Sequence, residues 1–199
     1  MQKSPENPPA AWLWRPVPEI LNQELHVRVG GSFVWPPPNI DLKEVKRVVF
    51  VAGGVGINPL MSIIGYLAQV RTVSYVISIL YSVRNPGGQG LSSILFLDRL
   101  AESFASGFVK GELVLHLTSG EKESQSLNDS TVELAGWKMK TRRRRITNDD
   151  MLEVLGGVDV RGSTVVYVCG VPTMTDELVD AAQQAPGMDP KKVLFERWW

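Results

Sequence analysis

A short apolar segment that ends in a glycine-rich turn constrains this chain more than any other feature. Residues 48–52, Val-Val-Phe-Val-Ala, are all apolar, which is typical of a strand buried on both faces of a parallel sheet. Gly53 and Gly54 follow at once, and glycine lets the backbone turn with positive φ and approach a ligand closely. Pro59 then begins a helical pattern, a position that suits proline. The segment therefore predicts a strand, a glycine turn and a helix.

This layout is typical of a site for a nucleotide diphosphate, because the exposed N–H groups at a helix start carry partial positive charge. The spacing Gly-Gly-Val-Gly-Ile is neither the dinucleotide fingerprint G-x-G-x-x-G nor the phosphate loop that ends in Gly-Lys-Ser/Thr. No lysine follows that could reach a terminal phosphate, which argues against a triphosphate hydrolase. A tight turn that serves packing alone is the alternative interpretation of these glycines.

Composition narrows the classes of partner. The chain of 199 residues has a formal net charge of +0, so no nucleic acid partner is indicated. The four consecutive arginines at residues 142–145 lack interleaved aromatic residues and are predicted to form a solvated loop. No apolar run is long enough to span a membrane. The two histidines, His26 and His116, lack metal-ligand spacing, so no metal site is predicted.

From Lys46 onward the sequence alternates between strand and helix patterns, as in an α/β protein with a parallel sheet. The predicted fold is an open parallel sheet of about five strands with helices on both faces. Strands are predicted at residues 48–52, 75–81, 112–117, 164–169 and 193–195. Helices are predicted at residues 59–70, 92–103, 148–155 and 172–184. Residues 1–18 are expected to be extended, and residues 120–140 to form a long surface excursion.

A second strand, turn and helix repeat the pattern of the first. The strand ends at Cys169-Gly170, and Pro172 begins a helix two residues later. In an open parallel sheet, ligands bind beyond the carboxyl ends of the strands, so both glycine turns are expected at the same edge. Cys169 is the only cysteine, which excludes an internal disulfide. Its ordinary interpretation is a small, buried apolar residue at a strand end.

The order of several motifs resembles the nucleotide-binding half of the ferredoxin–NADP reductase superfamily. The motifs are Ala-Gly-Gly-Val-Gly-Ile-Asn-Pro at residues 52–59, Tyr-Ser-Val-Arg at 81–84, Arg-Ile-Thr at 145–147, Cys-Gly-Val-Pro at 169–172 and Glu-Arg-Trp-Trp at 196–199. The resemblance covers nearly the whole chain. It implies that residues 46–199 form an NAD(P)-binding domain.

The resemblance also implies roles for individual residues. The pyrophosphate of the dinucleotide would be held by Gly53, Gly54, Val55, Gly56, Ile57 and Asn58. Cys169 and Gly170 would shape the hydride-transfer pocket beside the nicotinamide ring. Trp199 or Trp198 could cover a flavin ring until nicotinamide replaces it, and the alternative is a hydrophobic anchor for the last strand.

In this superfamily a flavin-binding antiparallel barrel precedes the nucleotide domain. Its Arg-x-Tyr/Phe-Ser/Thr signature is missing before Lys46, and only one barrel strand, at residues 25–29, is expected. Residues 1–45 are therefore predicted to be a truncated barrel remnant and linker, without a flavin (FAD) site of their own. The exposed strand edge and the apolar residues Phe33, Val34 and Trp35 would favour self-association.

The expected function is hydride transfer between NAD(P)H and a flavin or another acceptor, as in an oxidoreductase of the ferredoxin reductase type. A non-catalytic NAD-binding module is the alternative. Arg84 at the end of the second strand is a candidate contact for a cofactor phosphate, with no acid beside it to select the ribose of NAD. The resemblance favours NAD over NADP and a mitochondrial location, with the cytoplasm as the alternative. The sequence identifies no electron acceptor.

Overall fold

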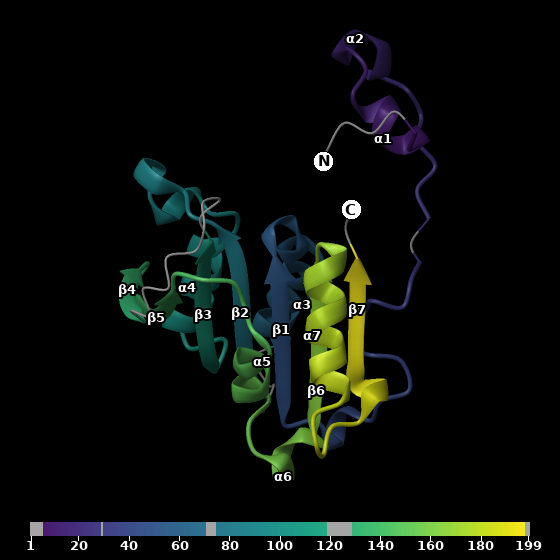
Figure 1. The fold of residues 1–199 in the computed structure, drawn as a ribbon. Coiled ribbons are helices and arrows are strands. Elements are labelled where there is room, and N and C mark those ends of the chain that lie inside the picture. The colour runs from purple at the N-terminus through teal and green to yellow at the C-terminus, as the bar shows by residue number, and fades with distance from the viewer. Residues whose placement is uncertain (1–5, 29, 71–74, 119–128, 198–199) are drawn as a thin grey trace. The chain divides into compact units, whose positions relative to one another are not determined.

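The computed structural model describes residues 6–28, 30–70, 75–118 and 129–197, in two compact units that divide between Gly31 and Ser32 (Figure 1). The first unit contains two short helices, α1 (Pro8–Leu13) and α2 (Val17–Ile20). The extended lead-in expected here is therefore partly helical. A proline lies in the first turn of each helix, and the Asn7 side chain accepts a hydrogen bond from the N–H of Ala10.

The expected barrel strand at residues 25–29 is not found. Residues 25–28 are exposed and form no strand, and residue 29 lies outside the described residues. Apolar and polar residues alternate there, but no described segment pairs with this backbone, and a strand forms only with a partner. The barrel remnant is thus not confirmed.

The second unit is built on a seven-stranded sheet in the order β4-β5-β3-β2-β1-β6-β7. All neighbouring strands are parallel except β4, which runs antiparallel to β5. The bounds are β1 (Arg47–Gly53), β2 (Val76–Arg84), β3 (Gly111–Thr118), β4 (Ser130–Leu134), β5 (Trp137–Arg142), β6 (Thr164–Gly170) and β7 (Val193–Arg197). The predicted α/β class and all five predicted strands are confirmed.

The two additional strands lie where a surface excursion was expected. β4 and β5 form a hairpin in which Leu134 pairs with Trp137 across Ala135-Gly136, two residues with positive φ. This is the tight turn that suits the twist of a hairpin. Met139 of β5 is buried and anchors the hairpin in the core. The sequence prediction failed because a hairpin at a sheet edge buries few apolar residues.

Helices cover both faces of the sheet, as expected. The strand β1 alternates between two hydrophobic clusters: Val48 and Phe50 face one, and Val49 and Val51 face the other. The first cluster includes α3 (Ile57–Val70) and α4 (Leu97–Ala105), and the second includes α5 (Asn148–Leu155) and α7 (Pro172–Gln183). None of the helices in the described part of the chain is long and apolar enough to cross a membrane.

The remaining helical segments are short. They are α6 (Val158–Arg161) and the 3-10 turns η1 (Leu42–Glu44), η2 (Gly54–Gly56), η3 (Gly87–Gln89), η4 (Leu91–Ser93) and η5 (Pro190–Lys192). The helix expected at residues 92–103 begins only at Leu97. Phe96 has a positive φ of 60°, which no α-helix accommodates, so the residues before it form η4 instead.

The segment before β1 packs on the sheet rather than presenting a free apolar surface. The ring of Phe33 contacts the ring of Tyr167 edge-on at 5.2 Å, and the Tyr167 hydroxyl donates a hydrogen bond to the carbonyl oxygen of Val34 at 2.7 Å. Trp35 is half-buried against Tyr75 and Tyr167. Phe33 and Trp35 are thus half-buried within the chain, whereas Val34 is exposed, and self-association stays a prediction.

Candidate functional site

The two glycine turns predicted from the sequence meet at one edge of the sheet. β1 and β6 are parallel neighbours, and Ala52 pairs with Cys169. Gly53 and Gly170, which come next, therefore lie side by side at the carboxyl ends of these strands (Figure 1). Ligands of open parallel sheets bind at this edge.

The first turn leads directly into a helix. The 3-10 turn η2 follows β1, and α3 begins at Ile57, two residues before Pro59. The Asn58 side chain donates a hydrogen bond to the carbonyl oxygen of Val55 at 2.6 Å, which holds the turn closed. The first N–H groups of a helix have no partner within it, and they carry partial positive charge. The start of α3 therefore favours an anion near the turn.

The glycines of this turn serve different purposes. Gly54 has a φ of +52°, and the space that its Cβ would occupy is open. Gly56 is buried, and a Cβ there would overlap the carbonyl oxygen of Cys169 and lie 3.0 Å from the backbone nitrogen of Gly170. Gly56 is therefore required for packing between the two turns, whereas Gly54 faces space that a ligand could use.

Gly53 and Gly170 leave room for a side chain that the sequence analysis did not single out. The Cβ positions of Gly53 and Gly170 would lie 2.9 Å and 2.5 Å from the terminal methyl carbon of Met174. Met174 belongs to the first turn of α7, directly after the second glycine turn. Met174 follows Pro172 by two residues, in a helix that starts at the sheet edge. This position is the sequence signal that could have identified Met174 as a residue of the site.

Cys169 lies beneath the turns rather than at their surface. Its side chain is fully buried in the first hydrophobic cluster, together with Ala52 and Ile57. Its backbone carbonyl is the group that contacts the Gly56 turn. These facts agree with the ordinary interpretation of Cys169 as a buried small residue. Trp198 and Trp199, the candidate aromatic cover, lie outside the described residues.

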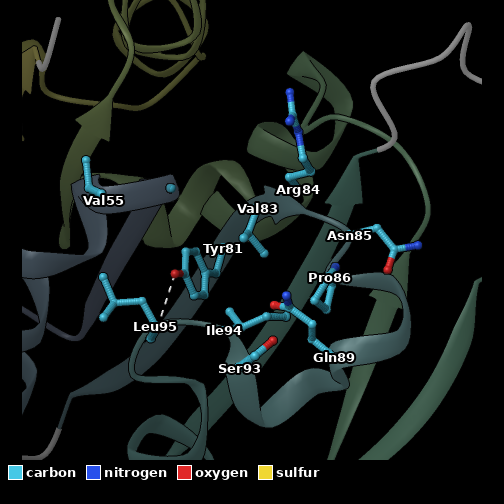
Figure 2. Close-up of a pocket in the computed structure, with 11 residues that line it drawn as sticks. Val55, Tyr81, Val83, Arg84, Asn85, Pro86, Gln89, Ser93, Ile94 and Leu95 are labelled. Carbon is cyan, nitrogen blue, oxygen red and sulfur yellow. Dashed lines mark hydrogen bonds between the residues drawn. The ribbon is translucent and has the colours of Figure 1, made fainter. Parts of the chain in front are cut away.

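A cavity of about 430 Å³ opens beside the first turn, between η2 and the end of β2 (Figure 2). It is lined by Gly54, Val55, Tyr81, Val83, Arg84, Asn85, Pro86, Gln89, Ser93, Ile94 and Leu95. Arg84 is the one charged residue among them, and in Figure 2 its side chain extends away from the apolar residues. The cavity thus combines an apolar floor with a single positive charge.

Tyr81 forms the side of this cavity that is nearest the core. Its hydroxyl donates a hydrogen bond to the carbonyl oxygen of Leu95 at 3.2 Å (Figure 2). Burial raises the pKa of Tyr81 to about 12, so the phenol keeps its proton at neutral pH. Tyr81 is fully buried and can therefore orient the loop before α4, but it cannot act as a base.

The predicted solvated loop of arginines is instead part of a buried ionic network. Arg142 and Arg144 both donate hydrogen bonds to the carboxylate of Asp150, whose side chain is 1% exposed. Arg142 also contacts a carboxylate oxygen of Glu153 at 2.9 Å. The N–H of Thr147 donates to Asp150 at 2.7 Å and completes a capping box at the start of α5. The interpretation as a solvated loop is wrong for Arg142 and Arg144, because charges of opposite sign cover them.

His116 lies under this network. It pairs in register with Arg142, and its Nδ1 lies 3.3 Å from the carbonyl oxygen of Arg144. Since a carbonyl oxygen only accepts, Nδ1 carries the hydrogen. Burial, opposed by Asp150, lowers the pKa of His116 to about 4, so the ring is neutral at pH 7. The described residues contain no group of three or more potential ligands that could hold a metal ion.

The fold defines a class of protein. The chain superposes on the crystal structure of the flavohem-like FAD/NAD-binding domain of nitric oxide dioxygenase from Vibrio cholerae, with a TM-score of 0.53, 15% identity, and coverage of 85% of this chain and 55% of that one. A flavohemoglobin from Malassezia yamatoensis with bound FAD and heme gives a TM-score of 0.52 over 82% of this chain and 36% of that one, at 15% identity. The α/β fold that the resemblance implied is thereby confirmed.

The sequence comparison identifies relatives over nearly the whole chain, at higher identity than the solved structures. The chain is similar to "Oxidoreductase NAD-binding domain-containing protein 1" from cattle (29% identity over 99% of this chain), human (30% over 99%) and zebrafish (29% over 99%). It spans 59%, 58% and 67% of the lengths of these relatives. No family model matches the chain. The resemblance predicted from the motifs is confirmed.

Proposed function

We propose that this chain is the nicotinamide dinucleotide-binding domain of an oxidoreductase, and that it holds NAD at the edge formed by the two glycine turns. The observation that carries the proposal is Gly54. Its φ of +52° favours glycine over all residues except asparagine and aspartate, and a Cβ there would meet nothing within 4 Å. The name of the sequence relatives, which specifies an NAD-binding domain, supports the same ligand.

The described residues fit a dinucleotide on both sides of this turn. The diphosphate would lie against the backbone of residues 54–58, where the start of α3 favours negative charge. The adenosine half would occupy the cavity beside β2, where Val55 offers exposed apolar surface and Arg84 a positive charge for a phosphate. The nicotinamide half would then lie toward Gly170, on the opposite side of β1.

When bound, NADH supplies a hydride for transfer to an acceptor. This chain's residues would orient the dinucleotide: the backbone of the first turn fixes the phosphates, and the Cys169-Gly170 turn limits how deeply the nicotinamide half can sit. Neither a free acid nor a metal site is required for hydride transfer, since the reacting groups belong to the cofactor and its acceptor. We propose from the resemblance that the hydride acceptor is a flavin or another group.

The described residues do not fit a flavin. They contain no antiparallel barrel, and residues 25–28 form no strand. This observation favours a second candidate function, an NAD-binding module without catalysis of its own. The two candidates differ in whether the purified chain, alone or with added FAD, oxidises NADH.

The test is a calorimetric titration of the full chain with NADH and NADPH, next to an absorption spectrum. We expect saturable binding of NADH, weaker binding of NADPH, and a thermal midpoint that rises with ligand concentration. Binding of neither nucleotide would overturn the proposal. Oxidation of NADH with added FAD would support the catalytic form, and binding without oxidation would support the module. A mitochondrial location is also proposed from the resemblance, and cell fractionation tests it.

A further inference from the structure

The side chain of Met174 links the two glycine turns. Its Sδ and Cε atoms both lie 2.9 Å from the position that a Cβ of Gly53 would take, and Cε lies 2.5 Å from the corresponding position at Gly170. The thioether therefore fills the space that the two glycines leave without side chains. The turns also approach each other directly, since the Gly170 Cβ position lies 3.2 Å from Cα of Gly53.

Met174 reaches the two glycine turns from the face of the sheet that α7 covers. It lies in the first turn of α7, which packs on β6 and β7 (Figure 1). The Met174 side chain is half-buried and packs against the second hydrophobic cluster, which includes Val51 and Val168. The Met174 side chain thus packs on the second hydrophobic cluster, and its terminal atoms lie against the backbone of both turns.

The position of Met174 in the sheet order assigns it to one half of a dinucleotide. The cavity with Arg84 lies at the end of β2, on one side of β1, and Gly170 lies at the end of β6, on the other side. A dinucleotide whose diphosphate lies at the first turn, with adenosine in the cavity, has its nicotinamide half on the β6 side. Met174 belongs to α7, which packs on β6 and β7 on this side, and its thioether also reaches Gly53 at the end of β1.

We propose that Met174 is a positioning residue for the nicotinamide half: its thioether supports the backbone of Gly53 and Gly170, in the turns that this half must contact. The inference rests on the proposed binding of NAD. An unbranched thioether suits this role because it fills irregular space between two backbone segments. Replacing Met174 by alanine leaves a gap beside Gly53 and Gly170, which lie beyond the last residues that pair β1 with β6, so these two glycines lose their support while the cavity beside β2 is unchanged.

The experiment compares two ligands, NADH and ADP-ribose, by calorimetric titration of the full chain. ADP-ribose carries the diphosphate and both riboses but lacks the nicotinamide ring. We expect Met174→Ala to weaken NADH binding about fivefold or more, and ADP-ribose binding by less than about twofold. Met174→Leu, which conserves most of the apolar volume, should restore NADH binding to within about twofold of the original chain.

Met151 provides the matched control. It is fully buried on α5 in the same hydrophobic cluster, and it is not among the nearest neighbours of the Cβ positions of Gly53 and Gly170. Met151→Ala should lower the thermal midpoint at least as much as Met174→Ala does, while the ratio of the two dissociation constants stays unchanged. The fluorescence of bound NADH, which reports the surroundings of the nicotinamide ring, should change in Met174→Ala alone.

The outcomes separate this inference from the proposed function. If the original chain binds neither ligand, the proposed function is wrong and the role of Met174 falls with it. If the original chain binds both ligands and Met174→Ala weakens both equally, or neither, the proposed function stands and the positioning role is wrong. A selective loss for NADH that leucine restores supports the role.

Discussion

Gly56 and Cys169 touch through their main chains: a Cβ on Gly56 would overlap the carbonyl oxygen of Cys169. Cys169 is the last residue of β6 that pairs with β1, so this contact holds the first turn directly against the second. A glycine in a nucleotide-binding turn is commonly attributed to the ligand. In this chain the absence of a side chain at Gly56 serves the protein itself, and only Gly54 leaves space for a ligand.

Gly56→Ala is therefore expected to destabilise the fold. The added methyl group meets backbone atoms that are fixed by the pairing of β1 with β6, so the two turns must move apart. We expect a loss of about 2 kcal/mol or more in the free energy of unfolding, as for overpacking in a core. Urea unfolding measures this change. An unchanged midpoint would contradict the contact.

Gly65 provides the control for that substitution. It lies inside α3, and a Cβ there meets nothing within 4 Å. Gly65→Ala should stabilise the protein by about 0.5–1 kcal/mol, because alanine is the better helix former. Replacing glycine by alanine is thus expected to lower the stability at Gly56 and to raise it at Gly65. A generic effect of replacing glycine cannot explain such opposite results.

Substitutions at Gly54 should affect the ligand more than the fold. Gly54→Val places a branched side chain in the open space and should abolish NADH binding, but valine also strains a backbone with a φ of +52°. Gly54→Asn separates the two effects, because asparagine tolerates this conformation. We expect Gly54→Asn to keep most of its stability and to bind NADH about tenfold more weakly or worse. Normal binding by this variant would refute the assignment of the turn.

Arg84 is expected to contribute charge to phosphate binding. It is the only charged residue in the lining of the cavity, so its attraction for an anion is not neutralised there. Arg84→Gln should weaken NADH binding by about tenfold to a hundredfold, the size of a charge-assisted hydrogen bond, and should reduce the dependence of binding on salt. The exposed Lys43 on η1, which does not line the cavity, provides the control substitution Lys43→Gln. Equal salt dependence in both variants would exclude a role for Arg84.

The sequence predicted the elements that bury continuous apolar runs or have strong end signals. β1 and β6 are of this kind, and so is α7, which begins at Pro172 as predicted. The hairpin of β4 and β5 was missed, because its solvent-facing residues mask the alternation that places Met139 in the core.

The contacts that define the candidate site were harder to predict. The turn at Gly54 was found because glycine clusters are rare and local. Met174 was not found, because its role comes from contacts with two strands that are distant in sequence. The arginines were misinterpreted for the same reason: Arg142 is buried, and Arg144 half-buried, because Asp150 on α5 packs against both. A pattern along the chain does not report such partners.

Asp150→Asn tests the ionic network. Asp150 accepts hydrogen bonds from two arginines and from Thr147, and its side chain is 1% exposed. The amide removes the buried negative charge that Arg142 and Arg144 share and leaves Arg142 only the more exposed carboxylates of Glu153 and Asp129, so we expect a loss of about 3–5 kcal/mol. The neighbouring Asp149 is exposed in the first turn of the same helix, and Asp149→Asn should cost only about 0.3–1 kcal/mol. Equal losses would contradict the network.

His116 should make the stability of this fold depend on pH. Burial lowers its pKa from 6.5 to about 4 in the folded chain, although the carboxylate of Asp150 favours the charged ring; Arg144 and Arg142 add to the lowering. Between these two values the unfolded chain binds a proton that the folded chain does not. The stability from this group is therefore complete above about pH 6.5 and is lost as the pH falls toward about 4.

The lowered pKa of Asp150, which Arg144 and Thr147 hold down against burial, has its effect only at lower pH, so His116 dominates this window. We expect the free energy of unfolding to fall by about 2 kcal/mol between about pH 7.5 and about pH 5, from the difference between the two pKa values. His116→Asn removes the titrating ring and keeps a donor for the carbonyl oxygen of Arg144. Urea unfolding at both pH values should show a smaller fall in this variant, and an equal fall would mean that His116 is already charged in the folded chain.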